Sequence, residues 1–443
     1  MVALLLVVPA RAQQKYWVFF ADKAGVEFQP RQYFHPRAIA RRQREGIPLN
    51  HFTDRPVRKD YLEQVGGLVD TVRHASRWFN AVAVWAHPKQ IRQVAALPFV
   101  MATEAMPVQQ ATLSQVPEVP PADADILTNL TIGQIARMGG EHFDSLKVNG
   151  AGVRVAIFDA GFPGTDTHPA LQHVRLRNGI KETYDFVRDR SDVYRANSHG
   201  TSVMSNIAGI RNGQKMGLAT GADFLLARTE TGWHERFSEE ENWVAALEWA
   251  DRYGAEVVNS SLGYTNARYF PRDMNGRKSL IARAANMAAA KGIVVVNSAG
   301  NEGNNPWKVI GSPADADSIL SVGGLAPWSD SHIGFSSYGP TADKRLKPNV
   351  CAYGRAAVAG KKATNRLMGP LLQARLWQGL WRAPASCSQT WPACNSCARW
   401  SAPETFTRIL TMRMAMGCRR PIASWLNGPN RKPPLTWSKK GTP

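Results

Sequence analysis

Short apolar segments alternate with helix-length stretches from residue 127 to residue 350, and this alternation constrains the fold more than any other feature of the chain. The apolar segments have the length and the Val, Ile and Leu content of buried strands, and they cover residues 152–158, 224–228, 257–259, 293–296 and 320–323. Patterns typical of helices lie between them, at residues 133–146, 200–208, 239–253 and 278–291. Apolar strands separated by helices predict an α/β fold in three layers, with helices on both faces of a doubly wound parallel sheet.

A different pattern precedes this region. Residues 15–105 are expected to form a small α+β domain of the ferredoxin-like β-α-β-β-α-β type. Its predicted strands and helices are, in chain order, Tyr16–Phe20, helix Pro36–Glu45, a hairpin within Val69–Ala86, helix Pro88–Leu97 and Phe99–Ala102. Residues 106–126 are rich in Pro, Ala and Val and have little periodicity, which predicts a linker to the main domain, residues 127–367.

The first residues resemble the apolar part of a signal peptide. Residues 1–12 are mostly Val, Leu and Ala and end in Ala10-Arg11-Ala12, a pattern typical of a cleavage site, although the expected basic segment before the apolar run is missing. We therefore expect a truncated signal peptide and a protein that is secreted, periplasmic or located at the cell surface. The run is too short to span a bilayer and no second such run follows, so no membrane partner is expected.

The net charge of +19 is unevenly distributed. Residues 361–443 hold 14 Lys or Arg and one acidic residue, Glu404, and so carry +13 of that charge, together with four of the five cysteines and six of the 14 tryptophans. The rest of the chain is only moderately basic, so we expect no nucleic-acid partner for it. Cys351 is the one cysteine among the first 360 residues, and the main body therefore does not depend on internal disulfides.

Polar residues follow three of the predicted strands, at the end where ligands gather in parallel sheets. Asp159-Ala160-Gly161 follows the first strand, Asn259–Gly263 the third and Asn297–Gly303 the fourth. An acid at such a position orients an imidazole, and an amide between glycines can reach a developing oxyanion. His199 lies at a loop-to-helix junction with Asn197 or Ser198 as N-cap, where the helix dipole favours the neutral imidazole that accepts a proton.

Each of these residues also has an ordinary structural explanation. Asp159 suits an Asx turn, the glycines around Asn301 suit a plain turn, and Asn259–Gly263 suits the exit of a strand. A single histidine is more often structural than catalytic. Only their combination favours a catalytic site.

Together these residues resemble the subtilisin-like serine peptidases. The resemblance rests on Asp159-x-Gly161, His199-Gly-Thr, Ser261-Leu-Gly263 and Ser298-Ala-Gly-Asn301, in the chain order of that family. It implies that Asp159 orients the imidazole, that His199 is the general base and that Asn301 donates to the oxyanion. It further implies a peptide cleft whose residues are Ser260, Ser261, Leu262, Gly263, Ser298, Ala299 and Gly300.

The same resemblance has consequences for the rest of the molecule. Residues 15–105 are similar to the family's propeptide, which inhibits the enzyme until it is removed, so the expected partners are polypeptide substrates and the chain's own propeptide. A monomer is expected. No cofactor is expected, and although calcium is possible by family, no metal motif is readable in the sequence.

The motif with the nucleophile, Gly-Thr-Ser-x-Ala/Ser-x-Pro, is missing from the written frame, because Gly200–Ser202 belongs to the histidine motif. A change of frame within Met368 explains its absence. Read from the last base of that codon, residues 368–379 permit Gly-Thr-Ser-Phe-Ala-Ser-Pro-Leu-Val-Ala-Gly. In the same frame, residues 413–419 permit Asp/Asn-Gly-Tyr-Gly-Val-Pro, which resembles a later stretch of the family. We therefore interpret residues 368–443 as an aberrant tail read out of frame.

Other hypotheses remain for the chain as written. Without a nucleophile it is a degenerate product or a peptide-binding pseudoenzyme. The basic segment 361–443 would alternatively bind a polyanion, and Cys394 with Cys397 would alternatively serve metal or redox chemistry. A tail read out of frame makes both of these last patterns accidental.

Overall fold

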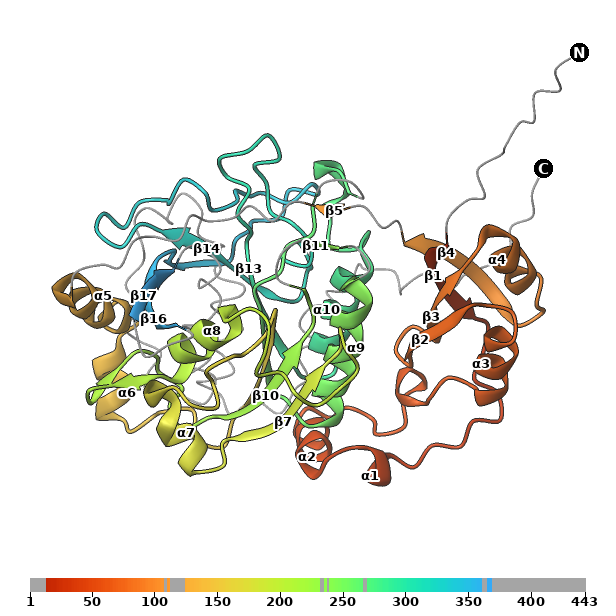
Figure 1. The fold of residues 1–443 in the computed structure, drawn as a ribbon, viewed down its shortest axis with the longest axis horizontal. Coiled ribbons are helices and arrows are strands. Elements are labelled where there is room, and N and C mark those ends of the chain that lie inside the picture. Colours follow the sequence, from red (N-terminus) through yellow and green to blue (C-terminus); the bar gives the residue numbers. More distant parts are fainter. Residues whose placement is uncertain are drawn as a thin grey trace, which may run out of the picture.

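The computed structural model of the chain describes residues 13–106, 110–111, 124–231, 235–236, 239–265, 269–360 and 365–368. These residues form an N-terminal domain (residues 13–106) and a main domain (residues 124–368) that lie side by side (Figure 1). The predicted signal peptide, most of the predicted linker and the predicted tail beyond Met368 lie outside the described residues. No helix within the described ranges is long and apolar enough to cross a membrane.

The N-terminal domain has an antiparallel sheet in the order β2-β3-β1-β4. Its elements include the predicted hairpin and are β1 (Gln14–Phe20), β2 (Thr71–Ser76), β3 (Ala81–Ala86), β4 (Val100–Met106), α3 (Lys59–Gly66) and α4 (Pro88–Ala95). Alternate residues of β1 serve two cores: Tyr16 and Val18 face α3 and α4, whereas Trp17 joins the core shared with the main domain. The sheet is therefore covered on both faces.

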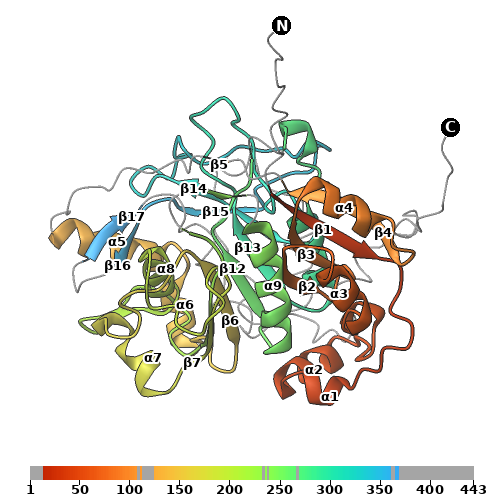
Figure 2. The ribbon, with the colours of Figure 1, turned by 45° about the vertical axis from the view of Figure 1, so that its right-hand side comes forward.

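The first helix of the predicted β-α-β-β-α-β unit is not the expected one. Helix α3 covers the sheet through Tyr61 and Val65, and the sequence prediction missed it. The predicted helix at residues 36–45 exists as α2 (Pro36–Arg44), but it belongs to a separate arm, residues 30–54, with α1 (Pro30–Tyr33) and the short helix η1 (Phe52–Asp54). This arm lies near the end of α9 (Figure 2) and has a small apolar cluster of its own, separate from the core of the small sheet.

The main domain contains the predicted parallel sheet, with seven strands where five were predicted, in the order β15-β14-β13-β12-β6-β10-β7. In chain order these are β6 (Arg154–Asp159), β7 (Ile180–Asp185), β10 (Asp223–Arg228), β12 (Val257–Ser260), β13 (Val294–Ser298), β14 (Leu320–Leu325) and β15 (Val350–Tyr353). Strands β7 and β15 were not predicted. Both lie at the edges of the sheet, and neither is fully buried, which weakens the apolar signal.

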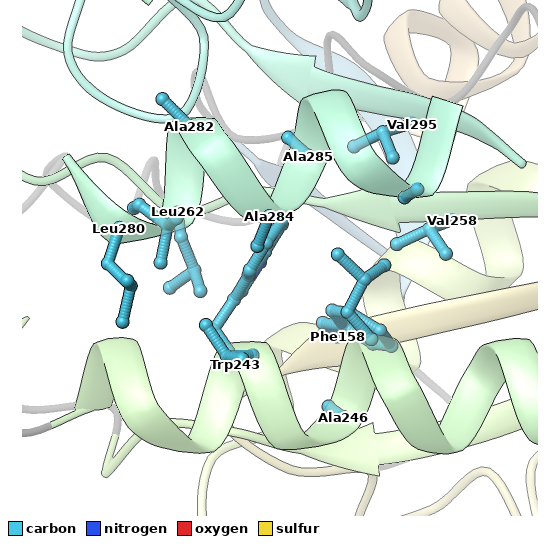
Figure 3. Packing of buried hydrophobic residues seen from close by; sticks show 14 of the residues in the cluster. Phe158, Trp243, Ala246, Val258, Leu262, Leu280, Ala282, Ala284, Ala285 and Val295 are labelled. Atoms are coloured by element: carbon cyan, nitrogen blue, oxygen red, sulfur yellow. The ribbon is translucent and has the colours of Figure 1, made fainter. Parts of the chain in front are cut away.

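Helices cover both faces of this sheet and complete three layers. One face packs against α9 (Glu239–Arg252) and α10 (Leu280–Ala290). Figure 3 shows Trp243 of α9 and Ala284 of α10 meeting close to the sheet residue Phe158. The other face packs against α8 (His199–Ala208), all of whose residues are buried. The predicted α/β architecture is therefore confirmed.

One predicted helix is wrong in its boundaries. Residues 133–146 were expected to be continuous, but the chain forms α5 (Ala124–Ala136) and α6 (Gly140–Ser145). Gly139 between them has a φ of +68°, which ends one helix and turns the chain into the next.

Short elements complete the described chain. They are η2 (Pro169–Leu171), α7 (Gln172–Leu176), η3 (Pro271–Asp273) and three small antiparallel pairs, β5 (Gln110–Ala111) with β11 (Glu235–Arg236), β8 (Ile210–Arg211) with β9 (Gln214–Lys215), and β16 (Ala356–Ala359) with β17 (Asn365–Met368).

The N-terminal domain covers the outer surface of α9, which lies between the two sheets (Figures 1 and 2). Glu241 forms an ion pair with Lys15 and accepts a hydrogen bond from the backbone N–H of His74 at 3.1 Å. Glu248 accepts from the hydroxyl of Ser76 at 2.5 Å and from the backbone N–H of Trp78 at 3.2 Å. The outward acids of α9 are thus buried against the other domain.

Candidate active site

Asp159 and His199, predicted as a pair, form direct hydrogen bonds. Asp159 is the last residue of β6 and is fully buried. Its two carboxylate oxygens lie 2.8 and 2.9 Å from Nδ1 of His199, and Oδ1 also accepts from the backbone N–H of Ala160 at 2.8 Å. A carboxylate in this position keeps the Nδ1 proton in place and leaves Nε2 as the acceptor.

His199 is the first residue of α8. Ser198 occupies the N-cap position, but its side chain makes no capping bond; the Oδ1 atom of Asn197 accepts from the backbone N–H of His199 at 2.8 Å instead. The Nε2 atom of His199 is buried and has no hydrogen-bond partner within the described part of the chain. A buried acceptor without a partner is costly, so this nitrogen is suited to a hydroxyl that arrives from elsewhere.

Gly161 allows β6 and α8 to approach closely enough for this pair. Gly161 has a φ of +146°, and a Cβ there would lie 2.3 Å from the carbonyl oxygen of Arg195. Gly161 also forms an isolated antiparallel bridge with Ala196, just before the histidine. The glycine of the Asp-x-Gly pattern is therefore required by backbone geometry.

The predicted cleft residues lie at and just after the ends of β12, which is next to β6, and of β13, which is next to β12. Because the strands are parallel, their carboxyl ends lie on the same edge of the sheet as Asp159. The side chains of Ser260, Leu262, Ser298 and Ala299 are buried, so these residues face a ligand only through their backbone. A Cβ on Gly263 would meet nothing within 4 Å, which leaves open space beside that segment.

A third segment, which was not predicted from the sequence, also lies at this edge of the sheet. Tyr264 and Ser312 exchange two backbone hydrogen bonds, at 2.8 and 3.1 Å, so residues around Ser312 lie directly beside the end of the Asn259–Gly263 segment. A Cβ on Gly311 would lie 2.9 Å from Cγ2 of Thr265. No strand pattern surrounds Ser312, which explains why pattern analysis missed it.

Asn301 lies in a loop that Ser337 holds in place. Gly300 has a φ of +109°, and its carbonyl accepts from the backbone N–H of Ser337 at 3.0 Å. The hydroxyl of Ser337 accepts from the N–H of Glu302 at 3.0 Å. Asn301 is half-buried, and its amide oxygen has no hydrogen-bond partner among the described residues. The structure places Asn301 on the same sheet edge as the Asp159–His199 pair, without a direct bond between them.

Helix α8 also supports the chain that leads toward Met368. The hydroxyl of Ser202 donates to the carbonyl of Ala359 at 2.8 Å, and the backbone N–H of Ala359 donates to the hydroxyl of Ser205 at 2.8 Å. Strand β16 therefore lies on the helix that carries His199, and β17 pairs with it. From the sequence, Ser202 was expected only to be part of the histidine motif and of a helix, and its contact with Ala359 was not predicted.

The parts of the chain that the structure describes contain no recognisable metal site. No group of three or more His, Cys, Asp or Glu side chains gathers there in a way that would hold an ion. The polar groups that the structure brings together at this edge of the sheet are the imidazole of His199 and the carboxylate of Asp159.

Comparison with known proteins gives two family matches. Residues 150–376 match the subtilase family, and residues 15–119 match the peptidase S8 propeptide domain of Bacteroidota. The chain is 26% identical to subtilisin NAT of Bacillus subtilis subsp. natto over 292 residues, which is 65% of each chain. It is 32% identical to the minor extracellular protease Vpr of Bacillus subtilis (strain 168) over 203 residues, 44% of this chain and 23% of that protein.

A plant protein gives a further match. The chain is 30% identical to subtilisin-like protease SBT6.1 of Arabidopsis thaliana over 234 residues, 51% of this chain and 20% of the plant protein. The chain thus spans less than two thirds of the length of each of these three relatives.

Proposed function

The chain belongs to the subtilase family and carries that family's propeptide domain, and from this premise we propose that it is a secreted serine endopeptidase that hydrolyses polypeptides. The observation that carries the proposal is the bond between the Asp159 carboxylate and Nδ1 of His199, with Nε2 left without a partner among the described residues. This arrangement is one that a general base needs.

The proposed reaction is acyl transfer in two steps. Nε2 of His199 takes the proton of a serine hydroxyl as that oxygen attacks the peptide carbonyl, and Asp159 stabilises the imidazolium that forms. The amide group of Asn301 donates to the oxyanion of the tetrahedral intermediate. The imidazolium then gives its proton to the leaving amine, and water attacks the acyl-enzyme by the same route in reverse.

The cleft is proposed to hold the substrate in an extended conformation. The backbone of Ser261–Gly263 on one side and of Ser298–Gly300 on the other would pair with the peptide, as a strand added to a sheet. The open space at Gly263 supports this role. No side-chain preference is proposed.

The nucleophile is proposed to be the serine of the Gly-Thr-Ser motif that a change of frame within Met368 restores. Strand β17 ends at Met368, and its partner β16 rests on the helix of His199. The family match ends at residue 376, shortly after that codon. We therefore propose that the tail from residue 369 replaces the segment that carries the nucleophile.

The N-terminal domain is proposed to inhibit the enzyme until it is removed. Its small sheet is docked on α9 of the main domain, and its last strand, β4, precedes the segment that leads to α5. The apolar segment at residues 1–12 supports export. We propose a monomer in which the +13 charge of the tail has no part in binding nucleic acid.

A second candidate is a pseudoenzyme that binds peptides without cleaving them, since no nucleophile stands in the written frame. A fluorophosphonate probe separates the two. We expect that the chain as written is not labelled and shows no turnover. After the frame is restored at codon 368, we expect both labelling by the probe and turnover of substrate. Labelling of the written chain at another serine would contradict the proposed nucleophile, and an inert frame-restored chain would favour the pseudoenzyme.

A further inference from the structure

Arg41, in the arm of the N-terminal domain, binds the main domain with its whole guanidinium. Its Nε donates to the carbonyl of Lys291 at 3.1 Å, Nη1 donates to the carbonyl of Ala255, and Nη2 donates to the carboxylate of Asp251. The Arg41 side chain is fully buried. The three acceptors belong to the main domain, so these bonds connect the two domains.

The acceptors come from the ends of two helices. Asp251 lies in the last turn of α9, Ala255 follows that helix, and Lys291 is the C-cap of α10. Helix C-termini carry a negative partial charge and carbonyl groups without partners, so a cation is favoured there. We call these three acceptors the arginine socket.

Glycines shape the surface around the socket. Gly254 has a φ of +76°, and a Cβ there would lie 2.7 Å from Cβ of Arg37. Gly292 has a φ of +80°, and a Cβ there would lie 3.0 Å from Cγ of Glu45. Both helices therefore end in glycines that let α2 approach the backbone closely.

The neighbouring charges have a different role from that of Arg41. Arg42 binds Asp54 of its own arm with two bonds, at 2.7 and 3.0 Å, and reaches Asp251 with a third at 2.8 Å. Arg77, in the turn between β2 and β3, also reaches Asp251, at 3.1 Å. Burial opposes ionisation, but the charges of Arg42, Arg41 and Arg77 bring the pKa of Asp251 down to about 2. Arg42 thus joins Asp54 of its own arm to Asp251, whereas all three acceptors of Arg41 belong to the main domain.

The arginine socket lies at the amino ends of the strands of the main sheet, whereas the candidate active site lies at their carboxyl ends. Ala255 comes just before β12 and Lys291 comes just before β13, so both lie at the amino ends of these strands. Asp159 and Asn301 follow the carboxyl ends of their strands. The arm therefore binds without entering the cleft, and anchoring is separate from inhibition.

We propose that the arginine socket is a guanidinium-binding site of the main domain that anchors the propeptide through Arg41, and that this anchor retains the propeptide after the linker is cut. Since both partners are buried, removal of either leaves an unpaired charge or unpaired carbonyls in a dry site, which costs far more than the loss of an exposed pair. The role of this anchor in maturation of a peptidase rests on the proposed function, whereas the binding of Arg41 to the socket does not.

The test uses the full chain with a site for a sequence-specific protease inserted among residues 112–123. After cleavage at that site, the two parts are expected to elute together in size-exclusion chromatography. When the complex is diluted, a labelled N-terminal part is expected to dissociate slowly. Arg41→Ala should speed its dissociation by on the order of 10²-fold. Arg41→Lys keeps one charge but cannot bind all three acceptors, and should also weaken retention.

Arg44→Ala is the matched control on the same helix. Arg44 also reaches the main domain, through Glu256 at 3.1 Å, but its side chain is 44% exposed, so dissociation should stay close to that of the unchanged chain. Millimolar methylguanidinium should slow dissociation of the Arg41→Ala protein by refilling the socket. The proposal is overturned if the unchanged chain separates on cleavage, or if Arg41→Ala and Arg41→Lys are both retained normally. The readout is association, so a chain without peptidase activity gives the same answer.

Discussion

The carbonyl oxygen of Gly161 accepts a hydrogen bond from the backbone N–H of Gly200 at 3.0 Å. This bond joins the loop after β6 to the first turn of α8, beside the pair formed by Asp159 and His199. A Cβ on Gly200 would lie 2.5 Å from that oxygen and 2.6 Å from Cε1 of Phe162. The distance between the carboxylate and the imidazole therefore depends on a position where no side chain fits.

Replacing Gly200 by Ala is expected to lower both stability and activity. The added methyl forces the helix away from the loop, which we expect to cost about 1–3 kcal/mol and to displace the imidazole enough for a loss of about 10²-fold in kcat/KM. Thermal melts of the chain and turnover of the frame-restored chain measure the two effects. Gly263→Ala is the control, because its Cβ meets nothing within 4 Å, and its melting temperature should not change. Equal melting temperatures for both variants would contradict the steric argument.

Asp159→Asn in the frame-restored chain is expected to reduce kcat by about 10⁴-fold, the size of loss known for this change in a serine peptidase triad. An amide donates where the carboxylate accepted, so the imidazole adopts the wrong tautomer. Asp166→Asn, in the same loop but exposed, is the control. A similar loss in both variants would mean that the loop, and not the bond to His199, is responsible.

Asn301→Ala is expected to lower kcat by about 10²–10³-fold, the range known for removing the oxyanion-hole amide of a subtilisin. KM should change little, because the oxyanion forms only after attack. Steady-state kinetics of the frame-restored chain separate the two constants. A change restricted to KM would assign Asn301 to binding of the ground state.

Asp315→Asn is expected to stabilise the protein at neutral pH. Burial raises the pKa of Asp315 to about 6, against the opposing effects of the Gly276 N–H, Ser312, Arg345 and Lys347. Between about pH 4 and pH 6 the unfolded chain loses this proton while the folded chain keeps it, so stability falls as pH rises, by roughly 2–3 kcal/mol in total. Melting temperatures of both proteins at pH 4 and pH 7.5 check this. The advantage of the Asn variant should be present at pH 7.5 and nearly absent at pH 4; equal differences at both values would contradict it.

The sequence located His199 from its place at the start of a helix, and it located the other site residues from the buried strands that precede them. Asp159 closes β6, all of whose residues are buried, and Asn301 follows β13, so each was placed by a strong local pattern. Ser337 and Ser312, which hold the cleft loops, lie in irregular chain far from these strands in sequence. Their contacts depend on tertiary structure, which no local pattern reports.

The outer surface of α9 shows the same limit for the fold. Its sequence indicates one apolar face, with Trp243 and Ala246, and one charged face that would ordinarily be exposed to water. In the structure Glu248 and Asp251 on that face are buried, because Arg41, Arg42 and Arg77, distant in sequence, cover them. The amphipathic pattern was interpreted correctly for the apolar side. The burial of the charged side could not be predicted, because the helix sequence does not show which segment of the chain packs against it.

Arg41 belongs to the segment that matches the propeptide domain, whereas Asp251 belongs to the segment that matches the subtilase family. A substitution at Asp251 leaves the finished enzyme with an ordinary surface change, yet it leaves the precursor with a buried guanidinium that has lost its counter-charge. If the N-terminal domain is removed as proposed, selection on Asp251 is expected to act through a residue that the mature molecule no longer contains. We therefore expect these two positions to change together in related chains.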